Sequence, residues 1–207
     1  SAVRAQEGWR ISGTWKFASG CKGAEVLGVG IITSEDDRSS PKPRVALMPA
    51  NQVQIVDNWE VVGLEGTGSH DLVVRDVFVP EAWTFIRGGT PVIDEPLYRY
   101  PIIPYAAQLH AIVNLGIARA ALNEIEELSH GRVAITGASR LADRPYVRSE
   151  IAKAEARLAS VRTFFYEATE AAWETVCAGD PVSAKQASMI RLATVEAARG
   201  GAAAVQA

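Results

Sequence analysis

Hydrophobic and polar residues alternate through residues 1–90, which is the pattern expected for half-buried strands. Residues 9–12 and 14–17 both alternate and Gly13 lies between them, so they predict two short strands joined by a turn. Residues 25–33 are mostly apolar and predict a strand buried on both faces. Further strands are expected at residues 44–48, 52–56 and 71–79. Such short, closely spaced strands are typical of an antiparallel sandwich or barrel.

Beyond Pro91 the hydrophobic positions recur with the period of a helix. Helices are expected at residues 105–130 and 145–178. A third helix is expected to open with Asp180 and Pro181 as its N-cap and first residue, and to continue to the end of the chain. Long helices in sequence predict antiparallel bundle packing, with an apolar face left over for self-association.

Strands followed by helices predict an α+β chain with an antiparallel sandwich or barrel and then a helical bundle. The expected domains are residues 1–92 and residues 93–207. Residues 35–43 are charged and rich in serine and proline, so they are expected to form an exposed loop. Residues 96–104 are expected to be a linker between the two domains.

Composition places the chain among ordinary soluble globular proteins. Hydrophobic residues make up 48%, charged residues 22%, and the formal net charge is −3. No face concentrates basic residues, which argues against a general nucleic-acid surface. No apolar run approaches the roughly 20 residues that span a membrane. The two cysteines are far apart in the sequence, as expected in a reducing cytoplasm.

Two glycine-containing stretches hold the candidate chemistry. Ser19 lies between an alanine and a glycine at an expected strand end, where a flat ligand can approach its hydroxyl closely. An ordinary turn serine is the alternative. Thr67, Ser69 and the glycines beside them can donate to carbonyl or phosphate oxygens. The stretch is neither a P-loop nor a dinucleotide fingerprint, and Ser69, His70 and Asp71 are too close in sequence to form a catalytic triad.

Several other side chains have both a structural and a functional interpretation. Trp59 precedes the second stretch and can flank a planar heterocycle, whereas core packing is expected for Trp9 and Trp173. Arg132 can pair with a phosphate held by another subunit, or it is a solvated charge at a helix end. Cys21 is expected to be a small buried hydrophobic residue. The three histidines have no metal-ligand spacing.

The two stretches together carry a resemblance to a known family. Residues 8–21 read GWRISGTWKFASGC, and residues 59–80 read WEVVGLEGTGSHDLVVRDVFVP, followed by a long helical half. This combination resembles the oxygenase components of two-component flavin-dependent monooxygenases, which are built on the acyl-CoA dehydrogenase fold. The resemblance implies that residues 1–92 are the middle β-domain and residues 93–207 a truncated C-terminal helical domain.

The resemblance also implies an activity. Reduced FMN or FAD, supplied by a separate NAD(P)H-dependent reductase, would react with oxygen to give a C4a-hydroperoxyflavin that hydroxylates a small aromatic or phenolic substrate. Ser19 matches the serine that hydrogen-bonds the flavin near N5, and is the catalytic candidate. Thr67, Ser69 and Trp59 match positions lining the flavin, and Arg132 matches, less securely, a basic residue reaching the flavin phosphate across a subunit interface. A cytoplasmic homotetramer is implied.

Two other functions stay open at the level of sequence. One is an acyl-CoA dehydrogenase with tightly bound FAD, which shares the fold. The other is a non-catalytic scaffold relative that acts through its helical face. By resemblance, the family's N-terminal helical domain and the end of its C-terminal domain are expected to be absent, so the chain alone is expected to be inactive.

Overall fold

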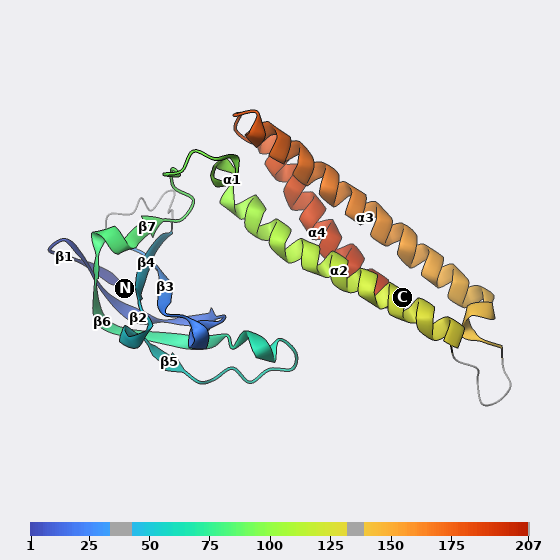
Figure 1. Cartoon of the computed structure of the whole chain (residues 1–207), viewed down its shortest axis with the longest axis horizontal. Helices are drawn as coiled ribbons and strands as arrows, with labels where there is room; N and C mark the ends of the chain where they lie inside the picture. The colour runs from blue at the N-terminus through green and yellow to red at the C-terminus, as the bar shows by residue number, and fades with distance from the viewer. Residues whose placement is uncertain (34–42, 132–138, 207) are drawn as a thin grey trace. The chain divides into compact units, whose positions relative to one another are not determined.

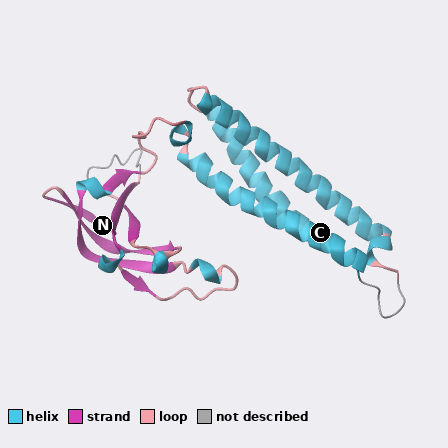
Figure 2. Ribbon diagram, viewed as in Figure 1, coloured by secondary structure: helices cyan, strands magenta, loops and turns pink. Residues whose placement is uncertain are grey.

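The computed structural model describes residues 1–33, 43–131 and 139–206. They form two compact units, Ser1–Thr90 and Pro91–Ala207. Figures 1 and 2 show that the first unit is built of strands and the second of long helices. The predicted α+β fold is therefore confirmed. The expected loop at residues 35–43 lies, except for its last residue, outside the described residues, as does Arg132.

The strands of the first unit form two antiparallel sheets around one core. A four-stranded sheet has the order β1-β2-β6-β5, and a three-stranded sheet has the order β3-β4-β7. The strands are β1 (Ala2–Ala5), β2 (Gly8–Ala18), β3 (Val26–Ile31), β4 (Arg44–Pro49), β5 (Gln54–Val56), β6 (His70–Pro80) and β7 (Thr84–Ile86). Buried side chains from both sheets belong to a single cluster, with Trp9, Met48 and Val74 almost completely covered. The unit is thus a two-layer sandwich.

The expected turn at Gly13 is wrong, because β2 is one continuous strand. Both halves of β2 pair with the same partner, β6, and the register shifts beside Gly13. The extra residue lies on β6, where Asp76 has a φ of 53°. The Asp76 carboxylate accepts from the Arg10 guanidinium at 2.6 Å, and its backbone N–H donates to the Ser12 hydroxyl at 2.9 Å. The alternation was interpreted correctly as β structure, but the glycine marks a bulge.

The expectation that residues 25–33 form a strand buried on both faces is also wrong. Only alternate residues of β3 are buried, namely Leu27, Val29 and Ile31. The opposite face carries Val26, which is 46% exposed, together with two glycines. Glycine has no side chain to bury, so an apolar composition does not mean a second buried face here.

The helices of the second unit are α1 (Pro96–Arg99), α2 (Ile102–Gly131), α3 (Pro145–Cys177) and α4 (Ala184–Gln206). The predicted linker at residues 96–104 is therefore wrong, since it holds α1 and the start of α2. The predicted start of the third helix at Asp180 and Pro181 is wrong as well. Ser183 accepts from the N–H of Gln186 at 3.2 Å, and the Gln186 side chain accepts from the N–H of Ser183 at 3.0 Å. This reciprocal capping box fixes the start of α4.

Small residues let α4 pack closely against both long helices. A Cβ on Gly200 would lie 2.8 Å from Val161 of α3, and a Cβ on Gly201 would lie 3.0 Å from the carbonyl oxygen of Asn114 of α2. Arg119 of α2 and Glu155 of α3 form a bidentate ion pair at 2.7 and 2.6 Å. Within the described residues, no helix has the length and apolar character needed to cross a membrane.

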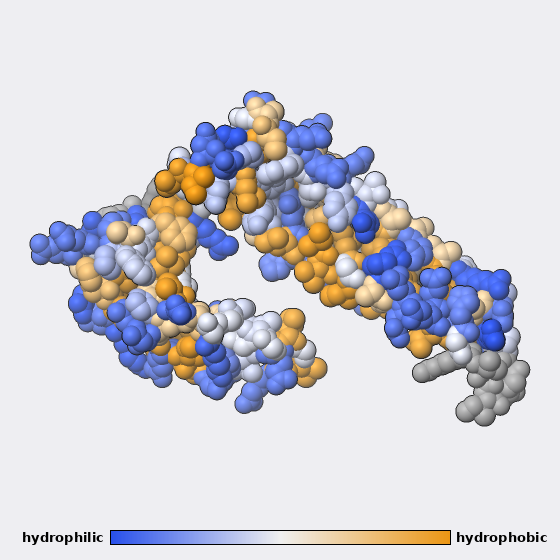
Figure 3. Space-filling model, viewed as in Figure 1, coloured by the Kyte–Doolittle hydropathy of each residue, from blue (hydrophilic) through white to orange (hydrophobic). Residues whose placement is uncertain are grey.

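One face of α2 is apolar and is left exposed by the described residues of its own unit. Figure 3 shows hydrophobic residues gathered along this part of the helical unit. The exposed aliphatic side chains include Leu109, Ile112, Val113, Ile117 and Ile125, each between 38% and 58% exposed. The buried face of the same helix is formed instead by Ala111, Leu115, Ala118 and Leu122.

Candidate functional site

The end of β2 and the start of β6 bring two turns together. Ala18 pairs with His70 in the sheet, so the residues that follow Ala18 lie beside those that precede His70. The N–H of Gly20 donates to the carbonyl of Thr67 at 2.8 Å. The buried thiol of Cys21, as predicted a small core residue, lies 3.6 Å from the carbonyl oxygen of Gly68. Residues 19–21 and 67–69, called the joined turns below, therefore form one surface.

A second β-bulge, near the end of β2, positions the turn at residues 19–21. Trp15 pairs with Leu72 and Ala18 with His70, so β2 carries one extra residue in this interval. Phe17 absorbs it with a φ of 63°, and its side chain is 70% exposed. Gly20 follows with a φ of 74°, a conformation that glycine adopts at little cost.

Three hydroxyl groups meet inside the joined turns. The Ser69 Oγ lies 2.8 Å from the Ser19 Oγ and 2.7 Å from the Thr67 Oγ1. Thr67 also donates to the carbonyl of Leu64 at 2.8 Å. Ser69 is 5% exposed, whereas Ser19 is exposed. The cluster thus runs from a buried hydroxyl to one that a ligand can reach.

Trp59 lies beside the three hydroxyl groups, because it also donates to the Leu64 carbonyl. Its indole Nε1 donates to the Leu64 oxygen at 3.2 Å. The Phe17 ring meets the indole edge-on, with ring centroids 6.1 Å apart and an interplanar angle of 83°. The indole is half-buried, so part of an aromatic surface remains open beside the hydroxyl groups.

His70 holds the loop that carries Trp59. Its ring is 6% exposed, and its Nδ1 accepts from the backbone N–H groups of Asn58 at 3.2 Å and Trp59 at 3.1 Å. Because Nδ1 accepts two hydrogen bonds, it is the unprotonated nitrogen of a neutral ring. The Asp57 carboxylate also lies 3.2 Å from Nδ1, but with that ring neutral we regard this as a contact and not as an ion pair.

The Asp57 carboxylate has a cationic partner of its own. The Lys22 ammonium donates to both carboxylate oxygens at 2.9 Å. This hydrogen bond, together with the charge of Lys22, holds the pKa of Asp57 below its ordinary value. The pair is exposed, so it contributes little to stability, but it connects the loop before Trp59 to the turn after Ser19.

The structure therefore brings Ser19, Thr67, Ser69 and Trp59 together, from segments about fifty residues apart in the chain. Trp9 is completely buried, as expected of a core residue. The same expectation for Trp173 is wrong, since that side chain is 42% exposed. Its helix turns it toward a pocket in the second unit.

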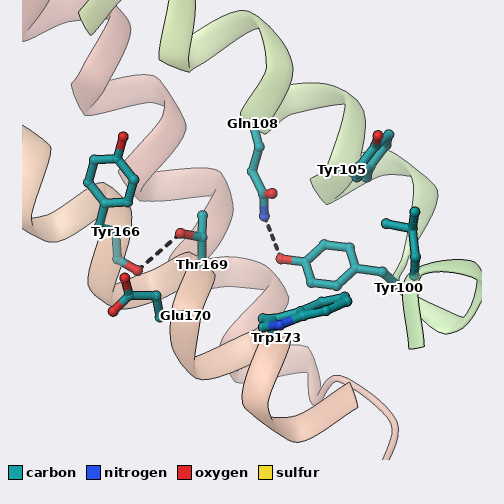
Figure 4. A pocket seen from close by; sticks show the side chains of 8 residues that line it. Tyr100, Tyr105, Gln108, Tyr166, Thr169, Glu170 and Trp173 are labelled. Carbon is teal, nitrogen blue, oxygen red and sulfur yellow. Dashed lines mark hydrogen bonds between the residues drawn. The ribbon is translucent and has the colours of Figure 1, made fainter. Parts of the chain in front are cut away.

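That pocket has a volume of about 340 Å³ and is largely aromatic, as Figure 4 shows. It is lined by Leu97, Tyr100, Tyr105, Gln108, Tyr166, Thr169, Glu170 and Trp173. The Gln108 amide donates to the phenol oxygen of Tyr100, whose pKa burial raises above its ordinary value. Sequence reasoning missed this pocket. The available signal was the spacing of Tyr166, Glu170 and Trp173, which places them on one helix face.

Comparisons with known proteins agree with this geometry. The family model of the acyl-CoA dehydrogenase C-terminal domain matches residues 108–207. The crystal structure of the HsaA monooxygenase from M. tuberculosis superposes with a TM-score of 0.83 at 27% identity, covering 99% of this chain and 55% of that one. The joined turns and the helical bundle thus belong to the acyl-CoA dehydrogenase-like fold.

Relatives similar in sequence include a monooxygenase and a hydroxylase. An indole-3-acetate monooxygenase from Pseudomonas putida is 52% identical over 192 residues, which are 93% of this chain and 49% of the relative. An FADH(2)-dependent resorcinol hydroxylase, oxygenase component, from Rhizobium sp. is 36% identical over 75% of this chain and 41% of its own length. The chain spans about half the length of the curated relatives it matches. Over this span the chain is similar to the oxygenase components of flavin-dependent monooxygenases, and its fold is that of acyl-CoA dehydrogenase-like proteins.

Proposed function

We propose that the protein is the oxygenase component of a two-component monooxygenase. It would use reduced FMN or FAD from a separate reductase, together with oxygen, to hydroxylate a small aromatic substrate. The observation that carries this proposal is the meeting of Ser19 and Ser69 in the joined turns, with Trp59 beside them. The chain is also 52% identical over 192 residues to an indole-3-acetate monooxygenase.

The residues of the joined turns fit a flavin. An isoalloxazine is a flat aromatic ring with a polar edge, and this site offers an exposed hydroxyl beside a half-buried indole. Ser19 and the backbone of Gly20 would hold the polar edge, because a Cβ at Gly20 would meet nothing within 4 Å and the approach is open. Trp59 and Phe17 would border the ring and exclude water there. When bound, reduced flavin supplies the electrons that let one atom of oxygen enter the substrate.

We also propose the assignment of the two units. The unit Ser1–Thr90 would be the middle β-domain that positions the flavin, and Pro91–Ala207 would belong to the C-terminal helical domain. The apolar face of α2 supports self-association, with a homotetramer as the expected state. The aromatic substrates in the names of the relatives, indole-3-acetate and resorcinol, support an aromatic ring as the substrate class. A cytoplasmic location would give access to a reductase that uses NAD(P)H.

The proposal is tested with protein made from the whole coding sequence. Reduced FMN or FAD is supplied chemically without air, and then ¹⁸O-labelled oxygen and an indole or phenol are added. We expect a hydroxylated product that carries one labelled oxygen atom, and no product when the reduced flavin is omitted. If instead an acyl-CoA bleaches a tightly bound FAD without any reductase, the protein is a dehydrogenase and the proposal is wrong.

A variant of Ser19 connects the activity to the joined turns. We expect Ser19→Ala to lower the hydroxylated product about tenfold per flavin oxidised, with hydrogen peroxide released in its place, because a hydrogen bond to the flavin is lost. Ser160→Ala is the matched control, since Ser160 is exposed on α3 and bonds only within its own helix among the described residues. An equal loss in both variants would remove Ser19 from the site.

A further inference from the structure

The three hydroxyl groups of the joined turns have a fixed direction of donation. The Leu64 carbonyl oxygen can only accept, so the 2.8 Å contact uses the hydrogen of the Thr67 hydroxyl. Thr67 then has only lone pairs left for Ser69, 2.7 Å away, and the Ser69 hydroxyl must donate to it. Ser69 in turn has only lone pairs left for Ser19 at 2.8 Å. Ser19 therefore donates inward.

The reverse direction would leave two oxygens in contact without a hydrogen between them. If Ser69 donated to Ser19, neither Thr67 nor Ser69 would have a hydrogen for their 2.7 Å contact. Water offers little relief, because Ser69 is 5% exposed and the Gly20 N–H bond to the Thr67 carbonyl holds the turns together. The series Leu64–Thr67–Ser69–Ser19, called the hydroxyl relay below, is thus polarised from the Leu64 carbonyl.

This polarity determines what Ser19 can offer a ligand. Its hydrogen is used inward, so the exposed hydroxyl presents only lone pairs and binds a donor. Position N5 of a reduced flavin carries a hydrogen, whereas N5 of an oxidised flavin carries none and can only accept. Resting on the proposed function, we propose that the hydroxyl relay makes this site select reduced flavin over oxidised flavin. Thr67 and Ser69 are then positioning residues that act through Ser19.

Such selectivity suits a protein that receives reduced flavin from elsewhere. In oxidised flavin, the lone pair of N5 would face the lone pairs of the Ser19 oxygen. Oxidised flavin is therefore released, and the site is left open for the next reduced flavin. The specificity comes both from the hydrogen bond with reduced flavin and from the repulsion of oxidised flavin.

The test measures dissociation constants for reduced flavin, without air, and for oxidised flavin in protein made from the whole coding sequence. In Thr67→Val the Ser69 hydrogen loses its acceptor and turns to Ser19, which frees the Ser19 hydrogen to face the ligand. We expect the preference for reduced flavin to fall about tenfold in this variant. Thr67→Ser keeps the hydroxyl and is expected to keep the preference. The midpoint potential of bound flavin should fall by about 30 mV in Thr67→Val for a tenfold change.

The outcomes separate this inference from the proposed function. If the unmodified protein binds flavin but Thr67→Val leaves the preference unchanged, the hydroxyl relay does not select the redox state. If the unmodified protein binds neither form, the proposed function is wrong and the inference falls with it. Ser69→Ala is the second variant. It removes the acceptor of the Ser19 hydrogen and should also lower the preference, even if Thr67→Val is too unstable to study.

Discussion

At the scale of single residues, His70 decides where Trp59 lies. The sequence argued against a catalytic triad of Ser69, His70 and Asp71, and the structure gives His70 a definite structural role. Its buried Nδ1 accepts the N–H groups of Asn58 and Trp59, which no strand partner satisfies. A buried amide without an acceptor costs about 1–3 kcal/mol, so one ring nitrogen holds the loop in place.

This role predicts different results for two substitutions of His70. His70→Leu removes the acceptor and should lower the free energy of unfolding by about 1–3 kcal/mol. His70→Asn places an amide oxygen close to the position of Nδ1 and should retain most of that stability. Urea unfolding followed by tryptophan fluorescence measures both. Equal losses in the two variants would show that ring packing, and not the acceptor, is what matters.

At the scale of elements, glycines decide how strands and helices meet. Gly13 was expected to end one strand, yet it lies inside β2 beside a bulge that Asp76 completes from β6. Gly200 and Gly201 lie inside α4 at its contacts with α3 and α2. In both cases the sequence reveals a glycine but not the neighbouring element that requires it.

The contact of α4 with α2 gives a prediction that opposes helix propensity. Alanine favours a helix over glycine by about 1 kcal/mol, so Gly201→Ala should stabilise an isolated helix. In this bundle the new Cβ would lie 3.0 Å from the Asn114 carbonyl, which belongs to the backbone and moves little. We therefore expect Gly201→Ala to lower the free energy of unfolding by about 1–3 kcal/mol.

The matched control for this prediction is the next residue. Ala202 is exposed on the same helix, and Ala202→Leu exchanges two good helix formers. Thermal unfolding of the two variants measures the difference. A stabilised Gly201→Ala protein would mean that α2 and α4 are farther apart than the structure has them.

At the scale of the whole molecule, the exposed face of α2 is the main unexplained surface. Apolar side chains at the spacing of one helix face are ordinarily buried, and here Leu109, Ile112, Val113 and Ile117 are all exposed. The proposed self-association would cover them.

Charges placed on that face should prevent the association. Ile112→Asp together with Val113→Asp would bury two carboxylates in an apolar interface, which is strongly unfavourable. We expect the sedimenting mass to fall from the oligomer to a smaller species. Tyr146→Asp, which also puts a carboxylate in place of an exposed apolar side chain but on α3, should leave the mass unchanged. A charged α2 face with an unaltered mass would overturn the proposed interface.

The sequence by itself determined that strands precede helices and placed most of the elements, although it did not predict β1, β7 or α1. Alternation and helical spacing depend only on local geometry, so β6 and α3 were predicted to within a residue at each end. It also determined that Ser19, Thr67, Ser69 and Trp59 were worth considering together, because two distinctive stretches carry them.

Only the tertiary structure decided how those residues meet. The bulge at Phe17, the pairing of Ala18 with His70 and the bond from Gly20 to Thr67 are all contacts between distant segments. The direction of the hydroxyl relay needs distances among four residues, which no sequence pattern contains. The aromatic pocket of the second unit was likewise missed because Tyr100 and Trp173 meet only when α3 packs beside the start of α2.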